Sequence, residues 1–193
     1  VNHISEGSLS SLNSWFTTPN NKVSSAHFGV GKKGEVRQYV AIENMAWGNG
    51  LRIDGRTTPH TGQSTSKIVK SRLNINPNKY SVSIEHEGIH RETVGELTTA
   101  QLNATIMLHQ YIREYVKDKW GKDIPANRDH ILGHSENAPI SKPLCPGERF
   151  PFNTIIQRLG GLSSENLPFE DIADHWAKET IIKAKELGLV SGV

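Results

Sequence analysis

Residues 80–88 read YSVSIEHEG, and residues 97–121 read LTTAQLNATIMLHQYIREYVKDKWG. The first stretch alternates between two faces, one apolar apart from a histidine and the other polar, which predicts a half-buried strand. The second stretch carries apolar residues at helical spacing. Its Thr98–Gln101 pair is typical of a helix start, and Gly121 is typical of a helix end. A strand followed by a long amphipathic helix indicates an α/β domain.

The segments around this pair continue the alternation of strands and helices. The sequence predicts a short helix over 9–16, a hairpin over 26–41, a short strand over 130–135 and a helix over 152–161. We therefore expect an α/β fold with a single mixed central β-sheet flanked by helices. A further helical segment at the C-terminal end predicts a short helical appendage.

Composition limits the classes of protein that this chain can belong to. The 193 residues are 35% hydrophobic and 22% charged, with a net charge of +2, which fits one domain with a small appendage. No apolar run approaches the roughly 18 residues that span a bilayer. We expect neither a membrane span nor a nucleic-acid partner, and we expect a monomer. The chain starts at Val1 without a leader, so we expect it to be a piece of a longer protein.

The only cysteine, Cys145, lies in the stretch GHSENAPISKPLCPGERFPF, residues 133–152. A passive surface thiol is one interpretation of a cysteine in this polar, proline-rich setting. A cysteine nucleophile usually needs a base and a helix N-terminus, and the following Pro146–Gly147 pair argues against a helix there. A zinc ligand is the third interpretation, with His134 as a second ligand and the third drawn from elsewhere in the chain.

The histidines supply the candidates for that third ligand, and residue spacing alone does not choose among them. His109 lies on the apolar stripe of the long helix and is more typical of a core histidine. His175 belongs to the C-terminal segment. His90 lies close to His86 in sequence. We favour His3, at a predicted strand end, over His60 and His86.

An ordered set of motifs resembles a known family. The motifs are HISEGSLSSLNSWFTTPNNKVSSAHFGVGKKGEVRQYV from residue 3, AW from residue 46, SVSIEHEG from residue 81, GHSENAP from residue 133 and CPG from residue 145. Together they resemble the zinc-dependent N-acetylmuramoyl-L-alanine amidases, which include phage lysozyme-like amidases and animal peptidoglycan recognition proteins. The resemblance covers about residues 1–160. It implies hydrolysis of the amide between N-acetylmuramic acid and L-alanine in peptidoglycan, with Zn²⁺ as cofactor.

The resemblance also implies roles for individual residues. It assigns the zinc ligands to His3, His134 and Cys145, the water-activating carboxylate to Glu85 and oxyanion stabilisation to Lys142. This lysine stands three residues before Cys145, whereas relatives that have it place it two residues before the ligand.

Two other positions depart from the pattern of the family. Ala26 stands where some relatives have a tyrosine, which shifts the role of the base onto Glu85. Gly48 stands where many relatives have a substrate-contacting histidine. Residues 49–80 carry six basic residues against one acidic residue. They are predicted to line one wall of the substrate groove, and a solvated flexible loop is the alternative interpretation.

The C-terminal segment resembles a second family. Residues 168–193 resemble the first half of a surface-layer homology repeat, after a linker at 162–167 and an amidase domain at 1–161. A full-length region of this kind would bind a cell-wall polymer, so we expect a secreted or cell-wall-associated protein. The alternatives are a non-catalytic peptidoglycan-binding module, a cysteine peptidase with Cys145 as nucleophile, and a purely structural envelope protein.

Overall fold

A computed structural model describes residues 1–50, 52–53, 56–57 and 63–160. The predicted linker, the predicted surface-layer repeat with His175, and His60 lie outside these residues. Among the described helices, none has both the length and the apolar character needed to cross a membrane.

A four-stranded mixed sheet forms the centre of the fold. Its strands are β1 (Asn2–Ile4), β6 (Ile84–His86), β2 (Phe28–Val30) and β3 (Val36–Gln38), in that order across the sheet. Strand β6 pairs in parallel with β1 and with β2, whereas β2 and β3 form the antiparallel hairpin predicted from the sequence. The single mixed sheet of the expected α/β fold is therefore confirmed.

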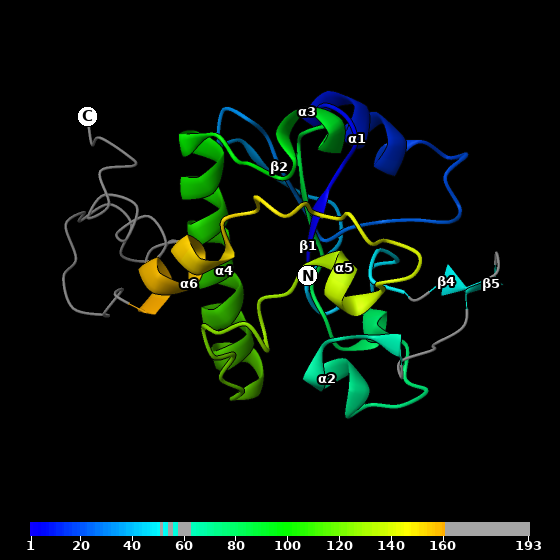
Figure 1. Ribbon diagram of the computed structural model, residues 1–193, viewed down its shortest axis with the longest axis vertical. Helices are drawn as coiled ribbons and strands as arrows, with labels where there is room; N and C mark the ends of the chain where they lie inside the picture. Colours follow the sequence, from blue (N-terminus) through cyan, green and yellow to red (C-terminus); the bar gives the residue numbers. More distant parts are fainter. Residues whose placement is uncertain (51, 54–55, 58–62, 161–193) are drawn as a thin grey trace.

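Helix α4 (Thr99–Trp120) covers one face of the sheet, and α6 (Phe152–Gly160) packs against its outer side (Figure 1). The Thr98 hydroxyl caps α4 by accepting from the Gln101 amide at 3.1 Å, as predicted. The Gln101 side chain does not complete a capping box, because it donates to the carbonyls of Val30 and Glu87. The core between sheet and helix consists of Phe28, Val30, Ile42, Ile84, Ala104, Leu108 and Ile112.

Helix α1 (Leu9–Thr17) packs against β2 on the opposite face of the sheet. Gly29 alternates with the core residues of β2, and a Cβ atom placed on it would lie 3.0 Å from Leu12 and 3.2 Å from Leu9. Only a glycine lets the helix approach the strand this closely. Figure 1 shows α1 and the short helix α3 (His90–Thr93) together at the end of the molecule where β1 and β6 finish.

The prediction of a strand over residues 130–135 is wrong. Only Gly133 forms a bridge, to Asn2, and His134 begins the short helix α5 (His134–Asn137). The Glu136 carboxylate accepts from the Gly133 amide at 2.8 Å and pairs with the Arg128 guanidinium, which also lies over the Phe152 ring. These contacts hold the chain in a helical turn immediately after the bridge.

The predicted excursion at residues 49–80 contains short elements that the sequence did not indicate. Strands β4 (Arg52–Ile53) and β5 (Arg56–Thr57) pair with each other, and α2 (Lys67–Lys70) and the 3-10 helix η2 (Pro77–Lys79) follow. The Thr65 amide donates to the Glu136 carbonyl at 2.9 Å, so the segment before α2 is attached to α5.

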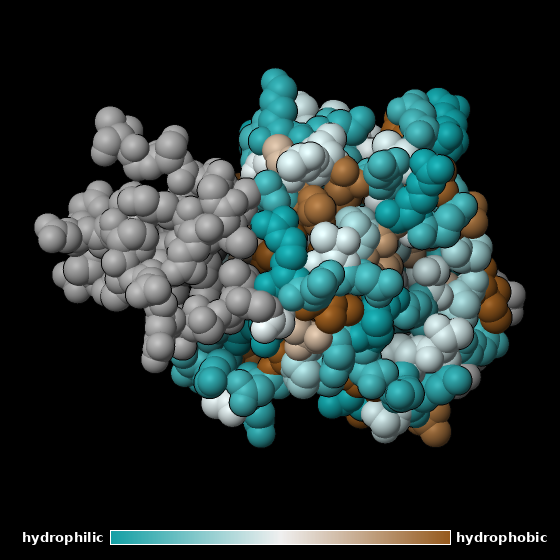
Figure 2. All heavy atoms as spheres, turned by 60° about the vertical axis from the view of Figure 1, so that its left-hand side comes forward, coloured by the Kyte–Doolittle hydropathy of each residue, from teal (hydrophilic) through white to brown (hydrophobic). Residues whose placement is uncertain are grey.

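The surface shown in Figure 2 is mainly hydrophilic where the chain is described. Its hydrophobic residues form separate small patches among hydrophilic ones.

We predict that Gly147→Ala unfolds the domain at a much lower urea concentration than Gly121→Ala. Gly147 has φ +122°, and an added Cβ would lie 2.2 Å from the Val94 carbonyl oxygen. Gly121 also has positive φ, +63°, but nothing lies within 4 Å of its Cβ position. The backbone cost at Gly121 is about 1–2 kcal/mol, whereas at Gly147 steric overlap raises it to about 4 kcal/mol or more. Equal urea midpoints for the two variants would contradict this.

Candidate metal centre

The register of the sheet places His3 beside Glu85. The strand pairing aligns His3 with Glu85 and Glu85 with Gly29 in one row across β1, β6 and β2. Since side chains alternate between faces along a strand, this row lies on the face opposite α4. The Nδ1 atom of His3 is 3.9 Å from a Glu85 carboxylate oxygen, and both side chains are largely buried.

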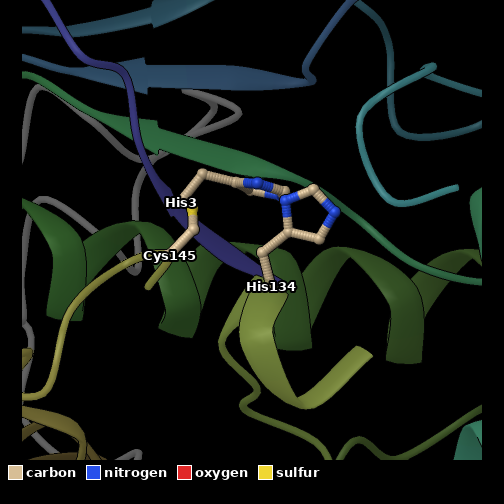
Figure 3. Close-up of side chains that lie close together, drawn as sticks. All are labelled: His3, His134 and Cys145. Atoms are coloured by element: carbon tan, nitrogen blue, oxygen red, sulfur yellow. The ribbon is translucent and has the colours of Figure 1, made fainter. Parts of the chain in front are cut away.

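Two segments from later in the chain bring His134 and Cys145 to the same place. His134 is the first residue of α5, and the Ser135 amide donates to the Cys145 carbonyl at 2.6 Å. The backbone amide of Ile4 donates to the Cys145 sulfur at 3.4 Å. One donor atom from each of His3, His134 and Cys145 lies within 4.8 Å of the others. Figure 3 shows the two imidazole rings and the sulfur converging from β1, α5 and the following loop.

Both imidazoles are held in the neutral form. Burial lowers the pKa of His3 well below its usual value of 6.5, and the nearby His134 lowers it further. Burial, helped by the positive charge of Lys142, lowers the pKa of His134 to about 3. A metal ligand must present a lone pair, so two neutral imidazoles fit that role.

Burial raises the pKa of the Cys145 thiol to about 12, so without a cation the sulfur keeps its proton. A cysteine nucleophile needs the opposite shift, which argues against the cysteine-peptidase hypothesis. A bound cation, in contrast, deprotonates a coordinating thiol.

The three side chains fit a zinc ion. Zinc accepts two imidazoles and a thiolate in a tetrahedral arrangement, in which the donor atoms lie about 3.3–3.6 Å apart for ordinary bond lengths. The observed limit of 4.8 Å requires only a small contraction. The Nε2 atom of His134 is buried without a hydrogen-bond partner in the described part of the chain. Three protein ligands would also leave one tetrahedral position for a small molecule.

Glu85 and Lys142 both lie close to this cluster. Burial raises the pKa of Glu85 to about 7, against an opposing effect of the Lys142 charge. Burial is the main cause of the pKa shifts of His134 and Cys145. The charge of Lys142 adds to the lowering at His134 and opposes the rise at Cys145. The exposed Lys142 therefore directs its positive charge at the cluster from the solvent side.

The other candidate histidines within the described residues lie elsewhere. His86 points to the α4 face, where its Nδ1 lies 2.9 Å from the His3 carbonyl and its Nε2 lies 3.1 Å from the Thr105 hydroxyl. His109 is a core histidine, as predicted, with its Nε2 3.0 Å from the Asn2 side chain. His90 belongs to α3, and its Nε2 lies 3.7 Å from a Glu148 carboxylate oxygen. The cluster contains His3 but neither His86 nor His90, and the assignment of His3 as a metal ligand stays a prediction.

The motif AWGNG, residues 46–50, contributes contacts that the sequence analysis missed. The Oδ1 atom of Asn49 lies 2.7 Å from Nε2 of His3, and the Gly50 backbone forms a hydrogen bond with His134. Asn137, on α5, donates to the Asn49 carbonyl. Asn49 is 1% exposed. The sequence offered one signal for Asn49, its position as a polar residue between Gly48 and Gly50. That signal did not identify His3 or Asn137 as its partners.

The two departures from the family pattern also have a structural setting. A Cβ placed on Gly48 would lie 2.9 Å from the Ser25 carbonyl, so this backbone leaves no room for a histidine there. Ala26 is completely buried and offers no proton acceptor in its side chain. Neither Gly48 nor Ala26 carries an ionisable group, whereas the Glu85 carboxylate lies 3.9 Å from Nδ1 of His3.

Three solved structures have a similar fold. A selenomethionine derivative of AmpD is 23% identical, with 82% of each chain covered and a TM-score of 0.53. AmpDh3 from Pseudomonas aeruginosa is 14% identical, with 99% of this chain and 67% of that chain covered and a TM-score of 0.53. Its complex with an anhydromuramic pentapeptide is 16% identical with the same coverage and a TM-score of 0.54.

The sequence comparisons give the family. A search of curated proteins finds no match. Residues 1–148, however, match the family described as N-acetylmuramoyl-L-alanine amidase, which is about three quarters of the chain. The chain therefore belongs to the N-acetylmuramoyl-L-alanine amidase family.

Proposed function

We propose that this protein hydrolyses the amide bond between the lactyl group of N-acetylmuramic acid and L-alanine in bacterial peptidoglycan, with zinc as cofactor. The observation that carries the proposal is the cluster of two neutral imidazoles and one buried thiol, with a carboxylate 3.9 Å from one of the imidazoles. Membership of the amidase family supports the substrate class. The ligands would be His3, His134 and Cys145.

When bound, zinc would supply a water acidified to a pKa of about 7 and would polarise a carbonyl oxygen. Glu85 would receive the proton of the attacking water and return it to the leaving amine of alanine, which is the role of a general base and acid. Its side chain is 15% exposed, so it is reachable from the site yet screened from bulk water. Lys142 would stabilise the negative charge that develops on the carbonyl oxygen.

The protein would act at the bacterial cell wall. We propose that residues 1–161 form the catalytic domain, that 162–167 are a linker, and that 168–193 are half of a surface-layer homology repeat. A repeat completed by further sequence would attach the enzyme to a cell-wall polymer. The basic residues of 49–80 would favour an acidic wall. A non-catalytic binding module remains the alternative function, and mass spectrometry of muropeptide products distinguishes it from an amidase.

We predict that the purified protein binds about one zinc ion per chain and that Cys145→Ser loses most of this zinc and most of its activity. A serine hydroxyl is a far weaker zinc ligand than a thiolate. Elemental analysis measures the loss of zinc. The release of peptides with a free N-terminal L-alanine measures the loss of activity. His90→Gln is the matched control, because His90 lies outside the cluster, and it should keep both properties. Full zinc content and full activity in Cys145→Ser would contradict the ligand assignment.

We predict that Glu85→Gln keeps its zinc but loses roughly 10²–10⁴-fold in turnover, the usual contribution of a general base. The amide has nearly the shape of the carboxylate, but it cannot accept the proton. Glu87→Gln is the control, because it makes the same change two residues along the chain, where the carboxylate accepts from the Lys32 amide. Turnover of Glu85→Gln near that of the control would assign the proton transfer to another group.

We predict that a chain ending at Gly161 hydrolyses soluble muropeptides as fast as the 193-residue chain. The proposed catalytic groups all lie between His3 and Cys145, so the remaining residues are not needed for the chemistry. Initial rates on a purified muropeptide provide the comparison. A large loss of turnover in the shorter chain, with its zinc content unchanged, would mean that residues after Gly161 complete the active domain.

A further inference from the structure

The hydrogen bonds that lead to His3 form a continuous chain through Asn49. The Ser81 hydroxyl donates to the Pro77 carbonyl at 2.6 Å. The Asn49 side-chain nitrogen donates to the Ser81 oxygen at 2.8 Å. The Asn49 side-chain oxygen then lies 2.7 Å from Nε2 of His3. Every link is within normal hydrogen-bond length.

The Pro77 carbonyl sets the donor-to-acceptor direction of this series of hydrogen bonds. A backbone carbonyl can only accept, so the single proton of the Ser81 hydroxyl is committed to Pro77. The Ser81 oxygen must therefore accept from Asn49, which places the amide NH₂ group on that side. The Asn49 oxygen faces His3 as a result, and an oxygen there requires a hydrogen on Nε2.

This requirement determines which nitrogen of His3 is available to a cation. A neutral imidazole has one N–H group and one lone pair. With the hydrogen held on Nε2, the lone pair is on Nδ1, the nitrogen that lies 3.9 Å from the Glu85 carboxylate. The side of the ring that faces Asn49 is correspondingly closed to a metal.

Asn49 also connects to the element that carries His134. Its carbonyl accepts from the Asn137 side chain on α5, and the next residue, Gly50, forms a backbone hydrogen bond with His134. Its own amide donates to the Asn78 side chain at 2.6 Å. Both hydrogen-bonding atoms of its side chain and both of its backbone are engaged, so it has little freedom to rotate.

We propose that Asn49 is a positioning residue that holds His3 in the Nε2–H tautomer, so that Nδ1 is its metal-binding atom. The proposal rests on the metal site of the proposed function, but not on the substrate or the reaction. Partners of this kind on the outer nitrogen of a histidine ligand typically contribute about 10–100-fold to metal affinity.

The first test is the tautomer of His3 in the zinc-free wild-type protein, measured from nitrogen-15 chemical shifts and long-range proton couplings of the imidazoles. We expect a protonated Nε2 and an unprotonated Nδ1. A proton on Nδ1 would overturn the proposal. This measurement needs no variant, so it does not depend on whether a substituted protein folds.

The second test compares zinc affinity among three variants by competition with a chromogenic chelator. Asn49→Leu has a similar size but no acceptor, and it should bind zinc about 10–100-fold more weakly. Asn49→Asp keeps an acceptor for the Nε2 hydrogen and should stay within about tenfold of wild type, since carboxylates commonly support histidine ligands. Ser25→Ala is the control, because it removes the hydroxyl that accepts from the Trp47 amide, two residues before Asn49, without touching His3.

The results separate this inference from the proposed reaction. A protein that shows the expected tautomer and affinities but leaves muropeptides intact would refute the reaction and support the inference. Wild-type affinity and tautomer in Asn49→Leu would refute the inference, even for a fully active amidase. Zinc binding by Asn49→Asp that is as weak as that of Asn49→Leu would also refute the inference. The inference requires that an acceptor facing Nε2 of His3 is enough to maintain zinc affinity.

Discussion

The parallel pairing of β1 with β6 is the constraint on which the rest of the site depends. It aligns His3 with Glu85 on the face away from α4. A slip of one residue would turn His3 toward the α4 core. Asn2 opposes such a slip, because its side chain donates to the Leu132 carbonyl at 3.2 Å and contacts His109 at 3.0 Å. Buried polar partners thus define the register as firmly as the apolar side chains around them.

The loop that carries Cys145 depends on a different contact, between two turns that are distant in sequence. Val94 has φ +54°, unusual for a branched residue, and its carbonyl accepts from the Arg149 amide at 3.0 Å. Gly95 and Gly147 pack backbone against backbone beside it, so neither position has room for a side chain. The position of the thiol is therefore set by main-chain fit between the α3–α4 turn and the cysteine loop.

Periodicity predicted strand β6, the β2–β3 hairpin and helix α4, because the pattern of each lies in the side chains of one continuous segment. The element at His134 was predicted wrongly because side-chain contacts, and not the local pattern of apolar residues, determine its conformation. Residues 130–135 have the short apolar run of a strand, but the salt bridge between Arg128 and Glu136 and the cap on Gly133 turn the chain instead. The resemblance to a family, rather than periodicity, gave the cluster of His3, His134 and Cys145.

Asn49 could not be predicted from the pattern of the sequence, because its partner His3 lies 46 residues away and its role is a direction of hydrogen bonding. That direction starts from the carbonyl of Pro77, which belongs to the main chain. Every amino acid offers the same carbonyl, so a substitution at position 77 that keeps the backbone path leaves this acceptor in place. Position 77 can therefore vary without loss of this hydrogen bond. The links that a mutation can remove are the side chains of Ser81 and Asn49.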